Sequence, residues 1–261
     1  MSLFSLHNKT AWVTGGGSGI GEAICLTLAK AGAVVHILEL NEETGRQTCD
    51  TIRKLWGKDR AHFWSVDISH QPDVMSVAAE ILKTGSVDIL VNNAGVAHVG
   101  SLEQTSEEDL DRLFSINVKG TYNCMYAVLS SMKQNGGGAI INIASTIASV
   151  AIKERFGYST TKGAVLTMTY AAAIDYIDVP IRCNAISPGR IHTPFVDGFI
   201  KKNYPGREKE MFDKLSTDHP IGRMGTPQEI ADLTLFLCSD EASFITGSNY
   251  SIDGGFTKLK N

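Results

Sequence analysis

The chain has 261 residues, 43% hydrophobic and 20% charged, proportions that are typical of an ordinary soluble globular protein. A net charge of −4 with no long basic run argues against a nucleic-acid partner, and no apolar stretch reaches the roughly 20 residues that span a membrane. The five cysteines include no Cys-x-x-Cys and the histidines include no His-x-x-x-His, so a disulfide framework and a metal site are not expected. No secretory signal pattern is present, and a cytoplasmic protein with reduced thiols is therefore favoured.

Residues 10–38 predict a strand–helix–strand unit with a glycine-rich turn. An apolar run at 10–14 leads directly into Gly15-Gly-Gly-Ser-Gly19-Ile-Gly21, a helical pattern follows, and a second buried run spans 33–38. Free amide groups at a helix N-terminus can hold a pyrophosphate. The spacing differs from the commoner Gly-x-Gly-x-x-Gly fingerprint, but its place between strand and helix favours a dinucleotide site.

Glu39 closes the second strand. An acid at this position can accept hydrogen bonds from the adenosine ribose and would repel a 2′-phosphate. Its neighbours Leu40 and Ser18 supply no positive charge for that phosphate, so the sequence favours NAD over NADP. An exposed acid that caps the next helix is the alternative interpretation.

The alternation of strands and helices continues along the chain. It predicts a parallel sheet covered on both faces, a doubly wound α/β fold in a single domain spanning 1–261. Right-handed connections then bring the C-terminal ends of the strands to one edge, where ligands bind. Further strands are expected at 62–66, 87–91, 139–144, 181–186 and 249–252, and further helices at 42–55, 73–82, 110–132, 157–176 and 227–238.

Residues 190–222 interrupt this rhythm. Insertions of this length at the ligand edge are usually functional, and the segment is therefore predicted to be a substrate lid. A solvated pair of surface helices fits its charges equally well.

Residues 142–163 carry the candidate proton-transfer groups. Ser145 follows the apolar run, Tyr158 comes thirteen residues later, and Lys162 four residues after that. On a helix, Tyr158 and Lys162 share a face. Considered alone, the motif is weak evidence, and a surface helix with a solvated lysine would be the better interpretation. The glycine turn and Glu39, which lie at the same sheet edge, favour an active site.

With Thr14-Gly-x-x-x-Gly-Ile-Gly21, Asn92-Asn-Ala-Gly95, Asn117, Ser145, Tyr158-x-x-x-Lys162 and Pro188-Gly189 in this order, the chain resembles the short-chain dehydrogenase/reductase family from about residue 6 to residue 255. The resemblance implies a Rossmann fold with seven parallel strands, a nicotinamide cofactor and a homotetramer. It also implies that Asn117, Ser145, Tyr158 and Lys162 form the catalytic tetrad. The cofactor residues that follow from it are Gly15, Gly17, Ser18, Gly19, Ile20, Gly21, Glu39, Asp67, Ile68, Asn93, Ala94, Gly95, Tyr158, Lys162, Pro188, Gly189, Ile191 and Thr193.

The chemistry implied is hydride transfer between a carbinol carbon and the nicotinamide, with Tyr158 as acid/base. A tyrosine pKa near ~10 must fall by roughly 2 to 3 units, and an ammonium about 4 Å away contributes roughly 4 kcal/mol, so Lys162 is expected to suffice. Ser145 would bind the substrate oxygen. Asn117 would hold a water beside Lys162.

The substrate is expected to contact residues that flank these motifs. Arginine and histidine donors among them suit a sugar, sugar acid or hydroxy acid, although each could instead be an exposed loop side chain. A reductase of oxoacyl thioesters and a non-catalytic NAD-sensing protein are the alternative functions. The candidate substrate residues are Ala97, His98, Ile147, Arg155, Phe156, Arg190, His192 and Phe195.

Overall fold

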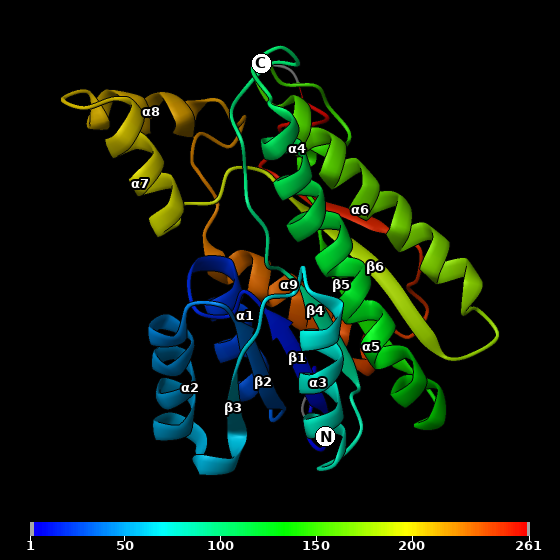
Figure 1. Ribbon diagram of the computed structural model, residues 1–261. Coiled ribbons are helices and arrows are strands. Elements are labelled where there is room, and N and C mark those ends of the chain that lie inside the picture. Colours follow the sequence, from blue (N-terminus) through cyan, green and yellow to red (C-terminus); the bar gives the residue numbers. More distant parts are fainter. Residues whose placement is uncertain (1–2, 260–261) are drawn as a thin grey trace.

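The computed structural model describes residues 3–259, with only the backbone described for Phe195, Lys202 and Asn203. Its strands form one seven-stranded sheet in the order β3-β2-β1-β4-β5-β6-β7. All neighbouring strands are parallel, and helices cover both faces (Figure 1). The predicted doubly wound fold is confirmed. The strands are β1 (Thr10–Thr14), β2 (Val34–Glu39), β3 (Ala61–Ser65), β4 (Ile89–Asn92), β5 (Gly138–Ile143), β6 (Ile181–Pro188) and β7 (Asn249–Ile252).

Each face of the sheet has its own hydrophobic cluster. Helices α1 (Gly19–Lys30), α2 (Glu42–Trp56) and α9 (Pro227–Cys238) pack on one face, and α3 (Gln71–Leu82), α5 (Gly120–Gln134) and α6 (Phe156–Asp175) pack on the other. Neighbouring strand residues alternate between the clusters, Val13 joining the first and Trp12 the second. Because both faces are covered, the strands read as continuous apolar runs.

The helix expected at 110–132 is interrupted. It begins earlier, as α4 (Glu107–Leu113), where the Ser106 hydroxyl accepts the Asp109 N–H at 3.1 Å. A π-helical segment (Phe114–Lys119) then leads into α5. The apolar periodicity is nearly the same on both sides of the π turn, and the sequence pattern therefore did not reveal it. Such turns are rare and often lie at functional sites, and this one contains Asn117.

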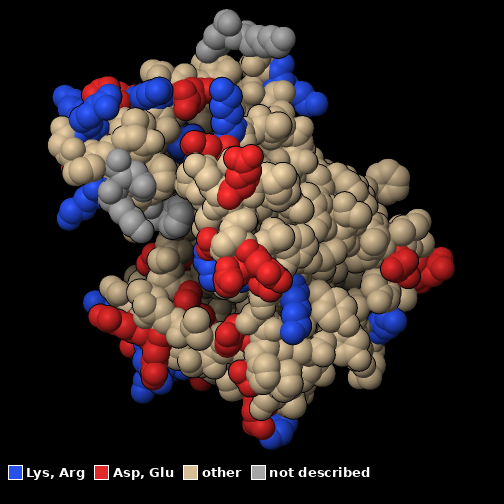
Figure 2. Space-filling view, turned by 45° about the horizontal axis from the view of Figure 1, so that its top comes forward, with Lys and Arg blue, Asp and Glu red and all other residues tan. Residues whose placement is uncertain are grey.

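The segment predicted as a lid forms two helices, α7 (Pro194–Asn203) and α8 (Glu208–Thr217), which stand apart from the sheet at the upper left of Figure 1. They have a small hydrophobic cluster of their own, built around Ile200, Met211 and Leu215. Lysine, arginine and acidic side chains gather on their outer surface (Figure 2). Within residues 3–259, no helix is both long and apolar enough to cross a bilayer.

Candidate active site

A cleft of about 710 Å³ runs along the carboxyl edge of the sheet. Residues at or just after the ends of all seven strands line it, from Asp67 after β3 to Phe256 after β7. This is the edge at which doubly wound folds bind ligands. Sixteen of the predicted cofactor residues line the cleft, and they are Gly15, Ser18, Gly19, Ile20, Glu39, Asp67, Ile68, Asn93, Ala94, Gly95, Tyr158, Lys162, Pro188, Gly189, Ile191 and Thr193.

Glycine keeps the turn after β1 close-packed and its backbone accessible. Gly15 and Gly19 have φ angles of 65° and 56°, which favour glycine. A Cβ at Gly21 would clash with the Gly15 carbonyl oxygen, so Gly21 lies behind the cleft and lets α1 pack closely. Within the described chain, the Ser18 side chain makes no capping hydrogen bond to α1. The first N–H groups of α1 are therefore left for a ligand, an arrangement that fits a pyrophosphate.

The Glu39 carboxylate lies at the cleft wall beside this turn. It accepts the Gly17 N–H at 3.1 Å and the Asn41 N–H at 3.0 Å. A Cβ at Gly17 would lie 2.5 Å from the Thr44 hydroxyl, so Gly17 stays behind the wall. No lysine or arginine among the described cleft residues borders Glu39. The corner at which the sequence placed the ribose is therefore negatively charged in the structure.

Asn93 ties β4 to the glycine turn. Its side-chain amide donates to the carbonyl oxygens of Thr14 and Gly15 at 3.1 and 3.0 Å. The Thr14 hydroxyl in turn accepts the N–H groups of Asn93 and Ala94, both at 3.0 Å. These four bonds hold the centre of the cleft in one geometry.

Ser145, Tyr158 and Lys162 meet on one wall of the cleft. Ser145 follows β5, and Tyr158 lies in the first turn of α6. Both line the cleft, and the Ser145 side chain acts to lower the pKa of Tyr158 against the effect of burial. One turn further along α6, the Lys162 ammonium donates to the Ile143 carbonyl at 2.7 Å and lies 5.8 Å from the centre of the Tyr158 ring. The structure therefore brings together the three groups that the sequence placed on a strand end and one helix face.

The electrostatics of this trio differ from the expectation. Burial raises the pKa of Tyr158 to about 12, and the opposing influences are the Ser145 hydrogen bond and then the charge of Arg155. Burial also lowers the pKa of Lys162 to about 8. Burial therefore opposes the lowering of the Tyr158 pKa that was expected from Lys162 together with the positive charge of the oxidised nicotinamide.

Asn117 lies behind the trio, outside the cleft lining. Its side chain accepts the Val96 N–H at 2.8 Å and donates to the Val96 carbonyl at 2.9 Å and the Thr161 hydroxyl at 3.0 Å. The Thr121 hydroxyl donates to its backbone carbonyl at 2.8 Å. Through these hydrogen bonds, Asn117 connects the loop after β4 to α6.

The predicted substrate residues divide into two groups. Ala97, Ile147, Arg155 and Arg190 line the cleft, whereas the side chain of Phe195 lies outside the described residues. Three others do not line it: His98 lies 3.6 Å from the Asp109 carboxylate, His192 lies 2.8 Å from that of Asp197, and Phe156 is exposed. An acid lies near each histidine in the structure, which sequence spacing did not show.

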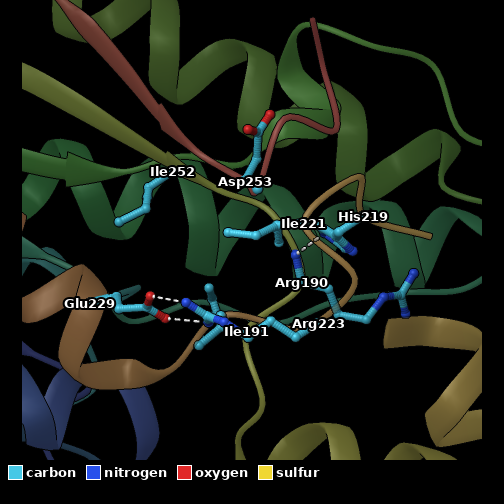
Figure 3. A pocket seen from close by; sticks show the side chains of 10 residues that line it. Arg190, Ile191, His219, Ile221, Arg223, Glu229, Ile252 and Asp253 are labelled. Atoms are coloured by element: carbon cyan, nitrogen blue, oxygen red, sulfur yellow. Dashed lines mark hydrogen bonds and ion pairs between the residues drawn. The ribbon is translucent and has the colours of Figure 1, made fainter. Parts of the chain in front are cut away.

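Sequence reasoning missed part of the substrate end. Val99, Ile152, Val196, Phe199, His219 and Phe256 also line the cleft. The His219 ring accepts the Arg190 N–H at 3.0 Å (Figure 3). It also lies 5.3 Å from the Phe256 ring, centre to centre. Asp253 fixes the Phe256 turn by accepting the N–H groups of Gly255 and Thr257. Of the missed residues, Val196, Phe199 and His219 fall within the segment 190–222 that the sequence predicted as a lid, whereas no sequence pattern pointed to Val99, Ile152 and Phe256 individually.

The family described as enoyl-(acyl carrier protein) reductase matches residues 15–257. That match covers the glycine turn, the trio and the C-terminal turn. The chain belongs to the short-chain dehydrogenase/reductase family. It is accordingly an oxidoreductase of that type.

Similar proteins cover nearly the whole chain. An uncharacterized oxidoreductase of Thermotoga maritima is 38% identical over 98% of this chain and 100% of its own length. Cyclohexanol dehydrogenase of an Acinetobacter species is also 38% identical, over 96% of each chain. The crystal structure of L-sorbose reductase from Gluconobacter frateurii, complexed with NADPH and L-sorbose, superimposes with a TM-score of 0.93 at 29% identity, covering 98% of this chain and 99% of the other.

Proposed function

We propose that this short-chain dehydrogenase/reductase uses NAD(H) to interconvert a secondary alcohol and the corresponding ketone. The substrate class that we favour is a sugar, a sugar acid or a related small polar alcohol. The observation that carries the proposal is the meeting of Ser145, Tyr158 and Lys162 on the wall of the cleft that also contains the glycine turn. The names of two similar proteins, a cyclohexanol dehydrogenase and an L-sorbose reductase, support secondary alcohols and ketones as substrates.

Ser145, Tyr158 and Lys162 have separate roles in the proposed alcohol oxidation. The Ser145 hydroxyl donates to the substrate oxygen and orients it towards Tyr158. The Tyr158 oxygen accepts the hydroxyl proton, and its anionic form is favoured by the Ser145 hydrogen bond and by positive charge nearby. Lys162, anchored on the Ile143 carbonyl and lining the cleft, supplies such charge. When bound, the nicotinamide ring supplies the hydride acceptor, and its positive charge further favours the tyrosinate.

The preference for NAD rests on Glu39. Its carboxylate holds the Gly17 backbone at the ribose corner, and an added 2′-phosphate would meet a like charge there. A 3-oxoacyl thioester reductase remains the alternative activity, in keeping with the description of the matching family. A non-catalytic NAD sensor is a second alternative, which the complete trio disfavours.

A homotetramer and a cytoplasmic location complete the proposal. Figure 2 shows few charged side chains on the side formed by α5 and α6, where Tyr122, Tyr126, Tyr170 and Ile174 are exposed. Such an apolar face is typical of an assembly surface. All five cysteines are free and buried, as suits a reducing compartment. Light scattering that found a monomer at micromolar concentration would contradict the assembly.

The test follows the absorbance of the reduced cofactor, with NAD and with NADP, against sugars, sugar acids, polyols, cyclic alcohols and oxoacyl esters. We expect turnover of at least one secondary alcohol and a higher kcat/KM with NAD. Equal kcat/KM with both cofactors would overturn the role of Glu39. Turnover confined to oxoacyl esters would favour the alternative activity, and binding of NAD without any turnover would favour a sensor.

A further inference from the structure

Two arginines lie at the substrate end of the cleft. We propose that Arg155 and Arg190 together bind an anionic group of the substrate, a carboxylate in the simplest case, so that the preferred substrates are hydroxy acids and the corresponding oxo acids. This inference rests on the proposed function, because it places the anion beside the reacting carbinol group.

The two side chains reach the same cleft from different segments. Arg155 directly precedes α6 and is fixed through backbone pairing of its segment with Gly100, while Arg190 follows β6. Both line the cleft together with Tyr158. Burial lowers the pKa of Arg190 and the positive charge of Arg155 adds to this effect, while the same charge opposes the burial that raises the pKa of Tyr158. Arg190 and Tyr158 therefore both lie within electrostatic reach of Arg155.

The charge of the two guanidinium groups is incompletely balanced. Arg155 donates to the Glu154 carbonyl at 2.8 Å, and within the described residues no carboxylate pairs with it. Arg190 has Asp218 at 3.9 Å, and its buried Nε has no acceptor in the described chain. Among the described residues, only Arg190 thus has a carboxylate within ion-pair distance, and that carboxylate is 3.9 Å away.

The neighbouring Arg223, by contrast, has a carboxylate that accepts its hydrogen bonds. Arg223 forms two bonds to the Glu229 carboxylate, of 2.6 and 3.0 Å, and the Arg190 side chain points away from that pair (Figure 3). A ligand carboxylate could give Arg155 and Arg190 the acceptor that Glu229 gives Arg223.

Charge is also separated along the cleft. Its two acidic lining residues, Glu39 and Asp67, follow β2 and β3, whereas the described lining around β5, β6 and β7 contains none. Three strand spacings separate β2 from β5, or about 14 Å. Apolar side chains such as Ile152, Phe199 and Phe256 form much of the remaining lining at the arginine end. These side chains can contact the hydrocarbon part of a substrate, and by excluding water they strengthen the interaction between the arginines and an anion.

This donor set favours an anion over a neutral sugar. A guanidinium can only donate hydrogen bonds, whereas each sugar hydroxyl both donates and accepts. The Arg155 and Arg190 forks match the two oxygens of a carboxylate. His98 and His192, which would have widened the donor set, are beside Asp109 and Asp197 instead.

The test compares lactate, β-hydroxybutyrate, γ-hydroxyvalerate and mandelate with their amides, which keep the shape and lose the charge. Binding to the NAD-loaded protein is measured by calorimetry and turnover by cofactor absorbance. The variants are Arg155→Gln and Arg190→Gln. Lys153→Gln is the matched control, because it removes the same charge from an exposed site outside the cleft. Circular dichroism confirms that each variant is folded.

We expect at least one acid to bind about 10- to 100-fold more tightly than its amide, as for loss of a hydrogen bond to a charged group. Arg155→Gln and Arg190→Gln should each remove this preference, and Lys153→Gln should keep it. Equal binding of all acids and amides, or a preference that survives both arginine variants, would overturn the inference. Turnover of neutral alcohols alone would overturn it and leave the proposed function standing. Acid binding that depends on both arginines, without turnover of any alcohol, would support the anion-binding role of Arg155 and Arg190 and contradict the proposed function.

Discussion

The two ends of the cleft are built in different ways. At the cofactor end, many of the contributing residues lie at or close after the end of a strand, as Gly15 does after β1, Glu39 at the end of β2 and Asp67 after β3. At the substrate end, Arg155, Arg190, His219 and Phe256 come from four separate segments. Local sequence order therefore describes the first end, whereas only tertiary packing defines the second. The acidic cofactor end and the basic substrate end should respond differently to substitution.

The largest effect is expected at the cofactor end, from Gly21→Ala. The new methyl group would collide with the Gly15 carbonyl, a backbone atom that cannot rotate away. We expect loss of NAD binding and a drop in stability of at least about 2 kcal/mol, as for overpacking of a close contact. Denaturant unfolding and NAD titration measure the two effects.

Gly198→Ala in α7 is the control for this variant, since a Cβ there meets nothing within 4 Å. Its unfolding free energy should stay the same or rise slightly. An unchanged NAD affinity in Gly21→Ala would show that the close packing of the glycine turn is not needed for the cofactor.

A smaller effect is expected from Glu39→Ala, which removes the acid at the ribose corner. NAD should lose about 10- to 100-fold in kcat/KM, as for loss of hydrogen bonds to a charged group. NADP should lose less or gain, because a like charge is removed. Steady-state kinetics with both cofactors give the ratio, and Glu43→Ala, on the exposed face of α2, is the charge-matched control. A cofactor ratio that stays constant would assign cofactor choice to other residues.

The smallest effect lies outside both ends, at His36 on β2. Burial, followed by the charge of His62, lowers the pKa of His36 to about 3, and its Nδ1 accepts the Trp64 indole N–H at 2.9 Å. Below the unfolded-state pKa of about 6.5, the unfolded chain binds a proton that the folded chain does not. Stability should therefore fall as pH falls from about 6.5 towards 3, by about 1.4 kcal/mol at pH 5.5 relative to pH 8.

Replacement of His36 with glutamine, His36→Gln, tests this linkage. Glutamine can still accept the Trp64 bond but does not titrate. The unfolding free energy of the wild type minus that of the variant should fall by about 1.4 kcal/mol from pH 8 to pH 5.5. A difference that is independent of pH would show that His36 titrates in the folded protein as it does in the unfolded chain.

Prediction from sequence succeeded where periodicity and strand ends carry the information. The seven-stranded parallel fold and the convergence of Ser145 with Tyr158 and Lys162 are examples. It failed where the determining contact is distant in sequence. The π turn around Asn117 leaves the apolar period almost unchanged, and the partners of His98 and His192 depend on how their loops fold. The high pKa of Tyr158 depends on burial, which charge counting at a fixed distance did not include.

The central claim is that Tyr158 exchanges the substrate proton at a cleft whose cofactor end is independent of it. The most direct test measures turnover and NAD affinity together in Tyr158→Phe, which removes only the hydroxyl group. We predict a loss of turnover of at least about 100-fold, the lower range for a positioned acid/base, with an NAD dissociation constant close to that of the wild type. Turnover within a few-fold of the wild type in this variant would contradict the account.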